Sequence, residues 1–431
     1  MTEPERARSP LQVASRVRRR RPTPPTFRSP LRGPWLTSVF GAVLLFGLPI
    51  VMITGLLSYM AYGPQFGQAM PADVGFLRLP HFDWPTDPAW LYRLTQGLHV
   101  GLGLILVPVV LAKLWSVIPK LFTVPPVRSV ASALERLSLI ALVGGIIFET
   151  ATGVLNIQYD YIFGFSFYTA HYWGAWVFIA GFVSHAILKI PTMVTALRSR
   201  SLMQVLQDKQ TQQETGESEL IAEDPDEPTI SRRGALALVG GGALFIAVLT
   251  VGQTTGGVLR TAAILLPRGR SYGDGPNDFQ INRTAAAAGI GADNTGSDWR
   301  LAISGGSTPL TLSREQLLNM EQHTADLPIA CVEGWSTVQT WTGVRLRDLA
   351  AAAGAENIAS TLVTSVETNG PFRQATLQSN QSLHPDSLLA LKVNGADLSL
   401  DHGYPARIIV PAMPGVHNTK WVASIEFRSA P

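Results

Sequence analysis

The sequence predicts a membrane-embedded all-α unit of four helices, a fifth spanning helix, and then an α+β domain. Hydrophobic residues make up 46% of the 431 residues and charged residues only 15%, well below the ~25% typical of soluble domains. Five apolar stretches are each long enough to cross a bilayer, which takes about 20 residues. After Thr261 the sequence changes to short alternating runs separated by Gly, Pro, Asp and Asn, a pattern typical of strands and turns.

The five apolar stretches and the charges beside them predict the topology. The stretches are Leu36–Ala61, Leu94–Ala112, Leu137–Leu155, Ile162–Leu188 and Gly234–Leu259. Lys and Arg collect in the N-terminal tail and after the second and fourth stretches, which predicts that these ends are cytoplasmic; they are Arg16, Arg18 to Arg21, Arg28, Arg32, Lys113, Lys120, Arg128, Lys189, Arg198 and Arg200. The opposite loops carry mainly Asp73, Asp83, Asp87 and Asp160. Because five is odd, we expect the C-terminal domain outside the plasma membrane of a bacterium.

Composition also sets the expected domain boundaries. Residues 1–34 form a basic cytoplasmic tail, which indicates contact with membrane lipid and not a nucleic-acid surface. Residues 35–198 hold the four helices, and residues 199–230 form an acidic linker that cannot bury a core. Residues 231–260 form the fifth helix and residues 261–431 the outer domain. The first apolar run is too long for a cleavable signal peptide.

The fifth stretch opens with Ser231-Arg232-Arg233-Gly234. This start resembles a twin-arginine export signal that is internal and uncleaved. The alternative is a pair of arginines at the cytoplasmic end of an ordinary helix. The twin-arginine machinery exports proteins already folded around a cofactor, and the single cysteine, Cys331, excludes an intramolecular disulfide. An outer domain with a cofactor would therefore favour the export signal.

The outer domain carries two separated motifs in a recognisable order. We expect strands at Trp299–Ser304, Leu362–Val366, Ala390–Val393, Ala406–Val410 and Trp421–Phe427, and short helices at Ser313–Met320 and Leu346–Ala353. The first motif is Ile329-Ala330-Cys331-Val332-Glu333-Gly334-Trp335-Ser336, followed by Trp341-Thr342-Gly343-Val344 and Leu346-Arg347-Asp348-Leu349. The second is His402-Gly403-Tyr404-Pro405-Ala406-Arg407, followed by Val410-Pro411, Gly415 and Lys420-Trp421-Val422. Together they resemble the sulfite-oxidase family of molybdopterin enzymes, over most of Ser271–Phe427.

This resemblance implies a molybdenum cofactor with Cys331 as the protein ligand, and soft sulfur donors suit such a metal. It also implies that the cofactor is contacted by His402, Arg407, Asn418, Thr419 and Lys420, by Asn277 and Gln280 at the start of the domain, and by Thr368 in the intervening strand. The alternative for Cys331 is a small buried hydrophobic residue. The alternatives for His402 and Arg407 are turn and surface residues.

The sequence also departs from the sulfite-oxidase pattern. Cys331 is followed by Val332-Glu333-Gly334-Trp335, where sulfite oxidases have an Asn and paired arginines. This is closer to the bacterial periplasmic branch, which includes the enzyme that reduces methionine sulfoxide in proteins, so sulfite is not the expected substrate. The chain ends soon after Lys420-Trp421, and the family's C-terminal immunoglobulin-like domain is not expected. No motif selects among possible anion contacts at Arg314, Arg345, Arg347 and Arg373.

Three histidines lie within the first four apolar stretches: His99, His171 and His185. Intramembrane histidines are usually functional. The unit resembles the four-helix cytochrome b subunits of formate dehydrogenase and related quinone-linked enzymes, and the resemblance implies an outer b haem between His99 and His171. His185 shares a helix face with His171, about 21 Å away, but has no partner histidine in the first stretch. The alternatives are a pairing of His99 with His185, or three structural histidines bonded across helices.

Glu149 is a carboxylate within the third stretch. It is either a proton acceptor for a quinol or an interfacial residue that reaches the headgroups. The expected function is a membrane oxidoreductase in which quinol reduces b haem, haem reduces molybdenum, and the metal transfers an oxygen atom from a small or protein-bound oxidised substrate. The sequence equally permits electron flow in the reverse direction, in which oxidation of a substrate reduces the quinone pool. The alternatives are a haem-containing electron-transfer scaffold with an inactive outer domain, and a membrane sensor without molybdenum or redox-active haem.

Overall fold

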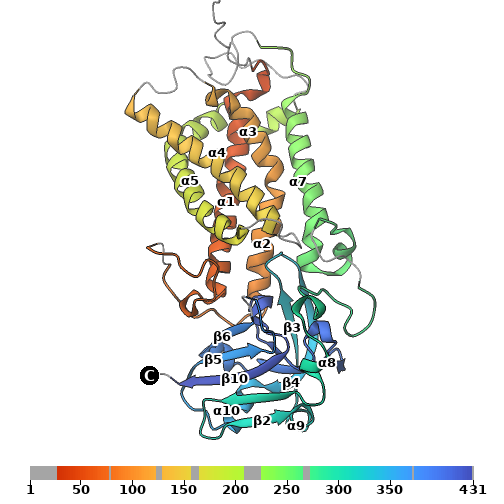
Figure 1. The fold of residues 1–431 in the computed structure, drawn as a ribbon. Helices are drawn as coiled ribbons and strands as arrows, with labels where there is room; N and C mark the ends of the chain where they lie inside the picture. Colours follow the sequence, from red (N-terminus) through yellow and green to blue (C-terminus); the bar gives the residue numbers. More distant parts are fainter. Residues whose placement is uncertain are drawn as a thin grey trace, which may run out of the picture.

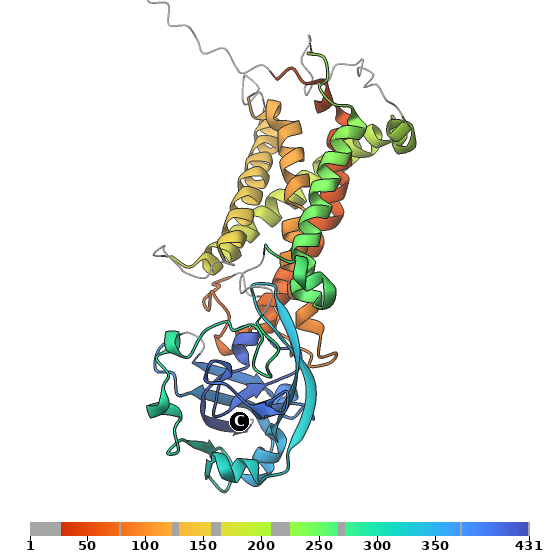
Figure 2. The same cartoon turned by 90° about the vertical axis from the view of Figure 1, so that its right-hand side faces the viewer.

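The computed structural model of the chain describes residues 27–76, 79–122, 129–156, 165–207, 225–265, 272–370 and 373–429. Figure 1 shows a bundle of long helices at one end of the molecule and a domain of strands and short helices at the other. Figure 2, turned by 90°, shows that the helices end on this domain. Some residues used to predict the topology lie outside the described residues: Arg16, Arg18 to Arg21, Arg128, Asp160 and the acidic linker from 208 to 224.

The bundle contains six long helices. They are α1 (Pro34–Ala61), α2 (Leu91–Ile105), α3 (Val107–Leu121), α4 (Val130–Asn156), α5 (Phe167–Arg198) and α7 (Arg232–Thr255), with the short α6 (Leu202–Gln207) before α7. Four of them, α1, α4, α5 and α7, are each long and apolar enough to cross a membrane. The consecutive helices α2 and α3 qualify as one bent span. The described residues therefore hold up to five segments that could span a membrane, in agreement with the predicted number.

The second span differs from the prediction because it is bent and longer than expected. Its halves, α2 and α3, meet at Leu106 with an angle of 42°, and α3 continues to Leu121, beyond the predicted end at Ala112. Pro108 lies in the first turn of α3. Proline has no backbone N–H and its ring clashes with the preceding turn, which kinks or breaks a helix. Pro108 in the sequence is therefore a signal that predicts a bend at this position.

The last two spans also begin or end away from the predicted positions. Helix α5 begins at Phe167, where the Ser166 side chain accepts a hydrogen bond from the Thr169 N–H, whereas the prediction placed the start at Ile162, outside the described residues. Helix α7 ends at Thr255 instead of Leu259. The next residue, Gly256, has φ of 74°, a conformation that costs glycine little and commonly terminates helices.

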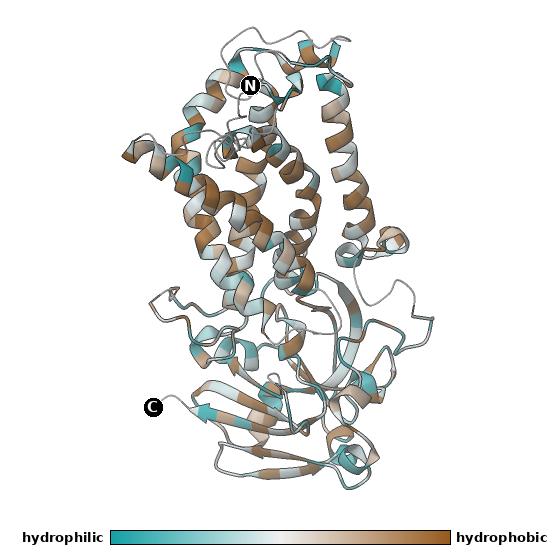
Figure 3. Cartoon of the chain, turned by 45° about the horizontal axis from the view of Figure 1, so that its top comes forward, coloured by the Kyte–Doolittle hydropathy of each residue, from teal (hydrophilic) through white to brown (hydrophobic). Residues whose placement is uncertain are grey.

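The outer surface of the bundle is apolar. Large hydrophobic side chains on several helices are exposed: Phe46 is 75% exposed, Leu238 70%, Phe245 64% and Leu137 63%. Figure 3 shows the hydrophobic colouring along the helices, while the domain is mixed. Soluble proteins rarely expose continuous apolar surface of this extent. These helices are therefore suited to lipid and could span a membrane.

The domain consists of two sheets and has the predicted α+β class. Its strands are β1 (Arg300–Ser304), β2 (Leu310–Ser313), β3 (His323–Ala330), β4 (Ser336–Arg345), β5 (Ile358–Ser365), β6 (Gln374–Gln378), β7 (Leu388–Val393), β8 (Ala396–Asp397), β9 (Arg407–Ile409) and β10 (Val422–Ser429). One sheet has the order β2-β1-β10-β5-β6, with β1 and β10 parallel. The other has the order β3-β4-β7-β8, with β9 beside β7. The short helices include α8 (Ala292–Thr295), α9 (Arg314–Leu318), α10 (Leu346–Ala352) and α11 (Ser379–Ser382).

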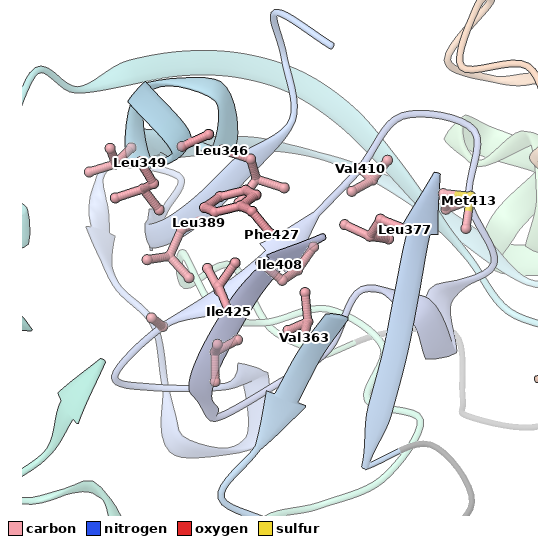
Figure 4. Packing of buried hydrophobic residues seen from close by; sticks show 14 of the residues in the cluster. Leu346, Leu349, Val363, Leu377, Leu389, Ile408, Val410, Met413, Ile425 and Phe427 are labelled. Atoms are coloured by element: carbon pink, nitrogen blue, oxygen red, sulfur yellow. The ribbon is translucent and has the colours of Figure 1, made fainter. Parts of the chain in front are cut away.

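The core lies between the two sheets. Figure 4 shows Val363, Leu389, Ile408 and Phe427, which come from strands of both sheets, packed together near Leu346 of α10. Each of these side chains is almost completely buried. Alternating residues of a strand point to opposite faces, so one face of each sheet builds this layer.

The same hydrophobic core continues into the helical bundle and the loop after α1. It includes Tyr62 at the end of α1, Trp84 in the following loop, and Tyr92 in α2. Trp84 donates its indole N–H to the Ala412 carbonyl at 2.8 Å, and its backbone N–H donates to Gln378 Oε1 at 2.9 Å. The helical bundle and the outer domain therefore share one hydrophobic core, and hydrogen bonds join residues that lie about 300 positions apart in sequence.

Candidate functional site

Cys331 occupies a tight turn between β3 and β4. The Gly334 N–H donates to the Cys331 carbonyl at 3.0 Å, and the Cys331 N–H donates to the Trp335 carbonyl at 2.9 Å. Gly334 has φ of 92°, which side-chain-bearing residues rarely adopt. The turn holds the thiol at the end of the hairpin, where it is 5% exposed.

One pocket brings Cys331 together with residues from distant parts of the chain. Its lining includes Gln280, His402, Arg407 and Lys420, all named from the sequence as cofactor contacts. Trp335 and Gly415 complete the wall beside the cysteine. The tertiary structure therefore assembles five of the predicted site residues around one space.

The pocket contains two buried cations. Arg407 donates through Nη1 to the His402 carbonyl at 3.0 Å and through Nη2 to the Asn418 carbonyl at 3.1 Å. Lys420 donates through Nζ to the carbonyls of Arg283 and Asp401. Burial lowers the pKa of Arg407 to about 9, and burial together with the neighbouring Arg407 charge lowers the pKa of Lys420 to about 7. Burial of a charged group costs free energy, so two buried cations in one pocket fit a bound anion such as a phosphate.

Several buried polar atoms, on two pocket-lining residues and on the segment between the lining residues Gly415 and Lys420, have no hydrogen-bond partner among the described residues. They are Gln280 Nε2 and Oε1, Arg407 Nε, His417 Nδ1 and Nε2, Asn418 Nδ2 and Thr419 Oγ1. An unsatisfied buried polar group costs about 1–3 kcal/mol, so such a cluster is rare without a ligand. The set contains both donors and acceptors, which suits a polar heterocycle with a phosphate tail. The residues present therefore fit molybdopterin.

His402 is held in place by contacts that the sequence did not reveal. Its ring stacks on Phe279 with a centroid separation of 3.7 Å, and its Nε2 lies 2.9 Å from the Asn277 carbonyl. Because a carbonyl only accepts hydrogen bonds, Nε2 carries the proton. Burial and the nearby Arg407 charge lower the pKa of His402 to about 3, so the ring is neutral at physiological pH.

Four predicted contacts lie outside the pocket lining: Asn277, Thr368, Asn418 and Thr419. The Asn277 side chain accepts from the Ser399 N–H at 2.7 Å and donates to the Asp397 carbonyl at 2.9 Å, so it supports the loop that carries His402. Thr368 is exposed, and its carbonyl accepts from Arg373 at 3.1 Å. In this structure these polar groups of Asn277 and Thr368 bond within the protein, and their contact with a cofactor stays a prediction.

The sequence analysis missed His417. It is 2% exposed in the short 3-10 helix Gly415–His417, and burial lowers its pKa to about 4. Its ring meets the Tyr62 ring edge-on, with centroids 5.3 Å apart. The signal available in the sequence was its position directly before Asn418-Thr419-Lys420.

Helices α1 to α5 of the bundle line a second cavity, and its lining includes both His99 and His171. The two imidazole centroids are 6.0 Å apart. His99 Nδ1 lies 2.9 Å from the Val51 carbonyl, and His171 Nδ1 lies 3.0 Å from Thr152 Oγ1 and 3.1 Å from Glu149 Oε2. These contacts occupy Nδ1 of each ring, so Nε2 carries the lone pair that binds metals. A metal–nitrogen bond is about 2 Å long, so the separation of the two rings leaves room for one metal ion between them.

His185 is absent from the lining of this cavity. It lies 14 residues beyond His171 on α5, and its buried Nδ1 has no partner in the described part of the chain. The structure places His99 beside His171, which favours this pairing over that of His99 with His185. Glu149 is mostly buried beside His171, which favours a role within the bundle over one at the headgroups.

The described residues contain no group of three or more His, Cys, Asp or Glu side chains arranged to hold a metal ion. The four candidate anion contacts are engaged elsewhere. Arg314 pairs with Asp397, Arg345 pairs with Glu321 and Asp348, Arg347 lies 3.8 Å from Asp348, and Arg373 donates to the Thr368 carbonyl. None of the four lines the Cys331 pocket.

Comparison with known proteins matches the outer domain. Residues 289–431 match the family model described as oxidoreductase molybdopterin binding domain. The chain is 31% identical over 146 residues to the protein-methionine-sulfoxide reductase catalytic subunit MsrP of Xanthomonas campestris, covering 30% of this chain and 45% of that protein. It is 32% identical over 135 residues to the uncharacterized oxidoreductase YuiH of Bacillus subtilis, covering 30% and 65%. It is 27% identical over 159 residues to mitochondrial sulfite oxidase of Mus musculus, covering 30% and 29%. The chain thus spans about half the length of the first of these relatives.

Proposed function

We propose that this chain is a membrane-bound molybdenum-cofactor oxidoreductase that exchanges electrons with the quinone pool through b haem, because its residues 289–431 form a molybdopterin-binding oxidoreductase domain of the sulfite-oxidase and MsrP type. The observation that carries the proposal is the convergence of Cys331, His402, Arg407 and Lys420 on one pocket with unpartnered buried polar atoms. The membrane unit supplies a separate cavity with two facing histidines.

In the outer pocket each side chain has a proposed part in holding the cofactor. The Cys331 thiolate binds molybdenum, and soft sulfur suits this metal. Arg407 and Lys420 hold the phosphate, since both are buried cations. Gln280, His417, Asn418 and Thr419 offer their unpartnered atoms to the pterin. The bound cofactor supplies oxygen-atom transfer to or from the substrate.

In the membrane cavity, His99 and His171 are the proposed haem ligands. Histidine ligands usually donate their second nitrogen to a carbonyl or carboxylate, which fixes the ring and its tautomer. Val51 serves His99 in this way, and Glu149 with Thr152 serves His171. Quinone is the proposed electron-transfer partner of this unit, because its helices could place the cavity within a membrane.

Glu149 is also the proposed proton acceptor for quinol. Its Oε2 contacts His171, while its buried Oε1 has no partner among the described residues. The two roles make different predictions for Glu149→Gln. A proton-acceptor role predicts slower reduction of the haem by quinol, with reduction by dithionite unchanged. Unchanged quinol-driven reduction would leave Glu149 only as a support for His171.

We further propose that the start of α7 is a signal for the twin-arginine machinery. Export of the C-terminal domain by this machinery would place the domain outside the plasma membrane of a bacterium. Ser231 caps α7 by accepting from the Gly234 N–H at 3.0 Å, so Arg232 and Arg233 stand at the start of the spanning helix. A reporter fused to the C-terminus should appear outside only in cells with this machinery. Normal export in cells that lack it would remove the signal role of the two arginines.

The competing candidate is a haem-containing scaffold with an inactive outer domain. The buried Arg407 and Lys420 argue against it, because two charged groups kept in a pocket without a ligand only destabilise the fold. Elemental analysis of the detergent-purified protein decides between them. We expect about one molybdenum per chain together with iron, and loss of enzymatic turnover in a Cys331→Ser control. Iron without molybdenum, after expression in a host that makes the cofactor, would favour the scaffold.

A further inference from the structure

The turn that carries Cys331 is docked directly on the membrane helices. Gln96 of α2 donates through Nε2 to the Val332 carbonyl at 2.6 Å. On α7, Thr254 donates through Oγ1 to the Gly334 carbonyl at 2.7 Å, and the Thr254 carbonyl accepts from Ser336 Oγ at 2.8 Å. These three hydrogen bonds connect the predicted molybdenum ligand with two spanning helices.

The approach of the turn to α2 is very close. A Cβ added to Gly334 would lie 2.9 Å from Val100 Cβ, a separation that real side chains essentially never reach. Glycine is therefore required here by the neighbouring helix as well as by its positive φ. Val332 also lines the membrane cavity, as the one outer-domain residue among its lining.

Gln96 links the two candidate cofactor sites. It is 3% exposed and, besides donating to Val332, accepts from Ser58 Oγ of α1 at 2.7 Å. It lies three residues before His99, about 4.5 Å along the helix axis. One side of Gln96 is therefore a single helical turn from a proposed haem ligand, and the other contacts the residue that follows Cys331.

We propose that Gln96 is the positioning residue that couples the membrane cavity to the Cys331 pocket, by holding the Val332 carbonyl in a fixed place against α2. This inference rests on the proposed function, because it assigns the coupling between the two sites which that function requires. The Gln96–Val332 bond fixes the Cys331 turn and provides a short bonded connection from that turn to the helix of His99. Thr254 docks the same turn from α7, a helix without any of the proposed haem ligands.

This difference between Gln96 and Thr254 supplies a matched control. Gln96→Leu removes both hydrogen bonds of the side chain. Gln96→Glu, at a pH where the carboxyl group is ionised, keeps the acceptor for Ser58 and removes only the donor to Val332. Thr254→Val removes the bond to Gly334 with almost no change in shape. All three variants should keep the haem Soret band and their molybdenum, since none changes a proposed ligand.

The first measurement is electron exchange between the two centres after flash reduction of the purified holoprotein by a photogenerated flavin radical, without quinol or substrate. We expect Gln96→Leu and Gln96→Glu to slow this phase by about tenfold, as small displacements of reacting groups cost one to two orders of magnitude in rate. Thr254→Val should stay within about twofold of wild type, because the Gln96 connection is intact. Equal slowing in all three variants, or none in the Gln96 variants, would overturn the assignment.

The second measurement is amide hydrogen exchange of the 331–336 peptide, which does not depend on activity. Both Gln96 variants should speed exchange by about tenfold if this bond restrains the turn. Unchanged exchange in both would overturn the positioning role. A wild-type protein that lacks haem or molybdenum would instead count against the proposed function, so the two failures are distinguishable.

Discussion

The Cys331 pocket and the membrane cavity differ in how the chain treats their polar atoms. At the pocket, buried atoms of the lining residues Gln280 and Arg407, and of the neighbouring segment 417–419, have no partner within the described residues. In the cavity, by contrast, His99 and His171 each already use Nδ1, and most of the remaining wall is apolar. The pocket therefore suits a polar, charged ligand held at many points, and the cavity suits a largely apolar ligand held at two. Each site should fail in its own way when it is changed.

The largest effect is expected from removing a facing histidine in the cavity. His99→Ala and His171→Ala should each abolish the haem Soret band, because one axial donor is lost and nothing nearby replaces it. Molybdenum content should stay near wild type if the two sites are loaded independently. His185→Ala is the control and should keep the band, since His185 lies outside the cavity. An unchanged band in His99→Ala would contradict the haem assignment.

The next effect concerns the cations of the pocket. Arg407→Met should lower the molybdenum content of the purified protein by about tenfold or more, since charge-assisted hydrogen bonds to phosphate are among the strongest. The Soret band should not change. Arg347→Met is the control, because Arg347 lies on the surface outside the pocket. Equal loss in both variants would mean that the pocket does not hold the phosphate.

A third effect tests whether the two regions are separate bodies or one. Trp84→Ala removes a buried side chain that bridges the loop after α1 and the outer domain. Removal of such an aromatic residue typically costs about 3–5 kcal/mol, so we expect lower thermal stability of the outer domain in detergent. Trp90→Ala, at a half-exposed position, should change stability little. Unchanged thermal stability in Trp84→Ala would show that the outer domain does not depend on its contact with the helical bundle at this residue.

The smallest effect is a pH dependence from Lys420. Burial holds the pKa of Lys420 at about 7 in the folded state, compared with about 10.4 when unfolded. Between these values the unfolded state binds more protons, so the stability of the cofactor-free protein should rise with pH from about 7 to about 10. Lys420→Met should flatten this rise in thermal unfolding, and so should a bound cofactor phosphate. A rise that persists in Lys420→Met would assign it to another group.

Much of the architecture was determined by local sequence. The five predicted strands appear as β1, β5, β7, β9 and β10. In β1 and β5 buried residues alternate with more exposed ones, as expected for a half-buried sheet, whereas β7 and β9 are buried almost throughout. The apolar stretches form helices that are long and apolar enough to span a membrane, since length and composition decide what can cross a bilayer. Strands β3 and β4 were missed, since they flank the cysteine motif and carry polar residues and Pro328, which weaken the strand pattern.

The candidate site was predicted in part. Cys331, His402, Arg407 and Lys420 were found from two motifs and share one pocket. Asn277 was placed in contact with the cofactor, but its side chain serves the loop beside His402. His417 was missed because one buried histidine has no pattern of its own in a single sequence. A motif identifies residue types, whereas only the folded backbone decides which atoms face the ligand.

By itself, the sequence determined the class of each half of the chain and the position of the candidate metal ligand Cys331, because these depend on residues close together in the chain. Only the tertiary structure decided that the Cys331 turn lies on α2, through a hydrogen bond between Gln96 and Val332, which are 236 positions apart. It also decided that His99 faces His171 and not His185. Such contacts depend on how the helices pack and where the domain docks, and local patterns carry no record of either.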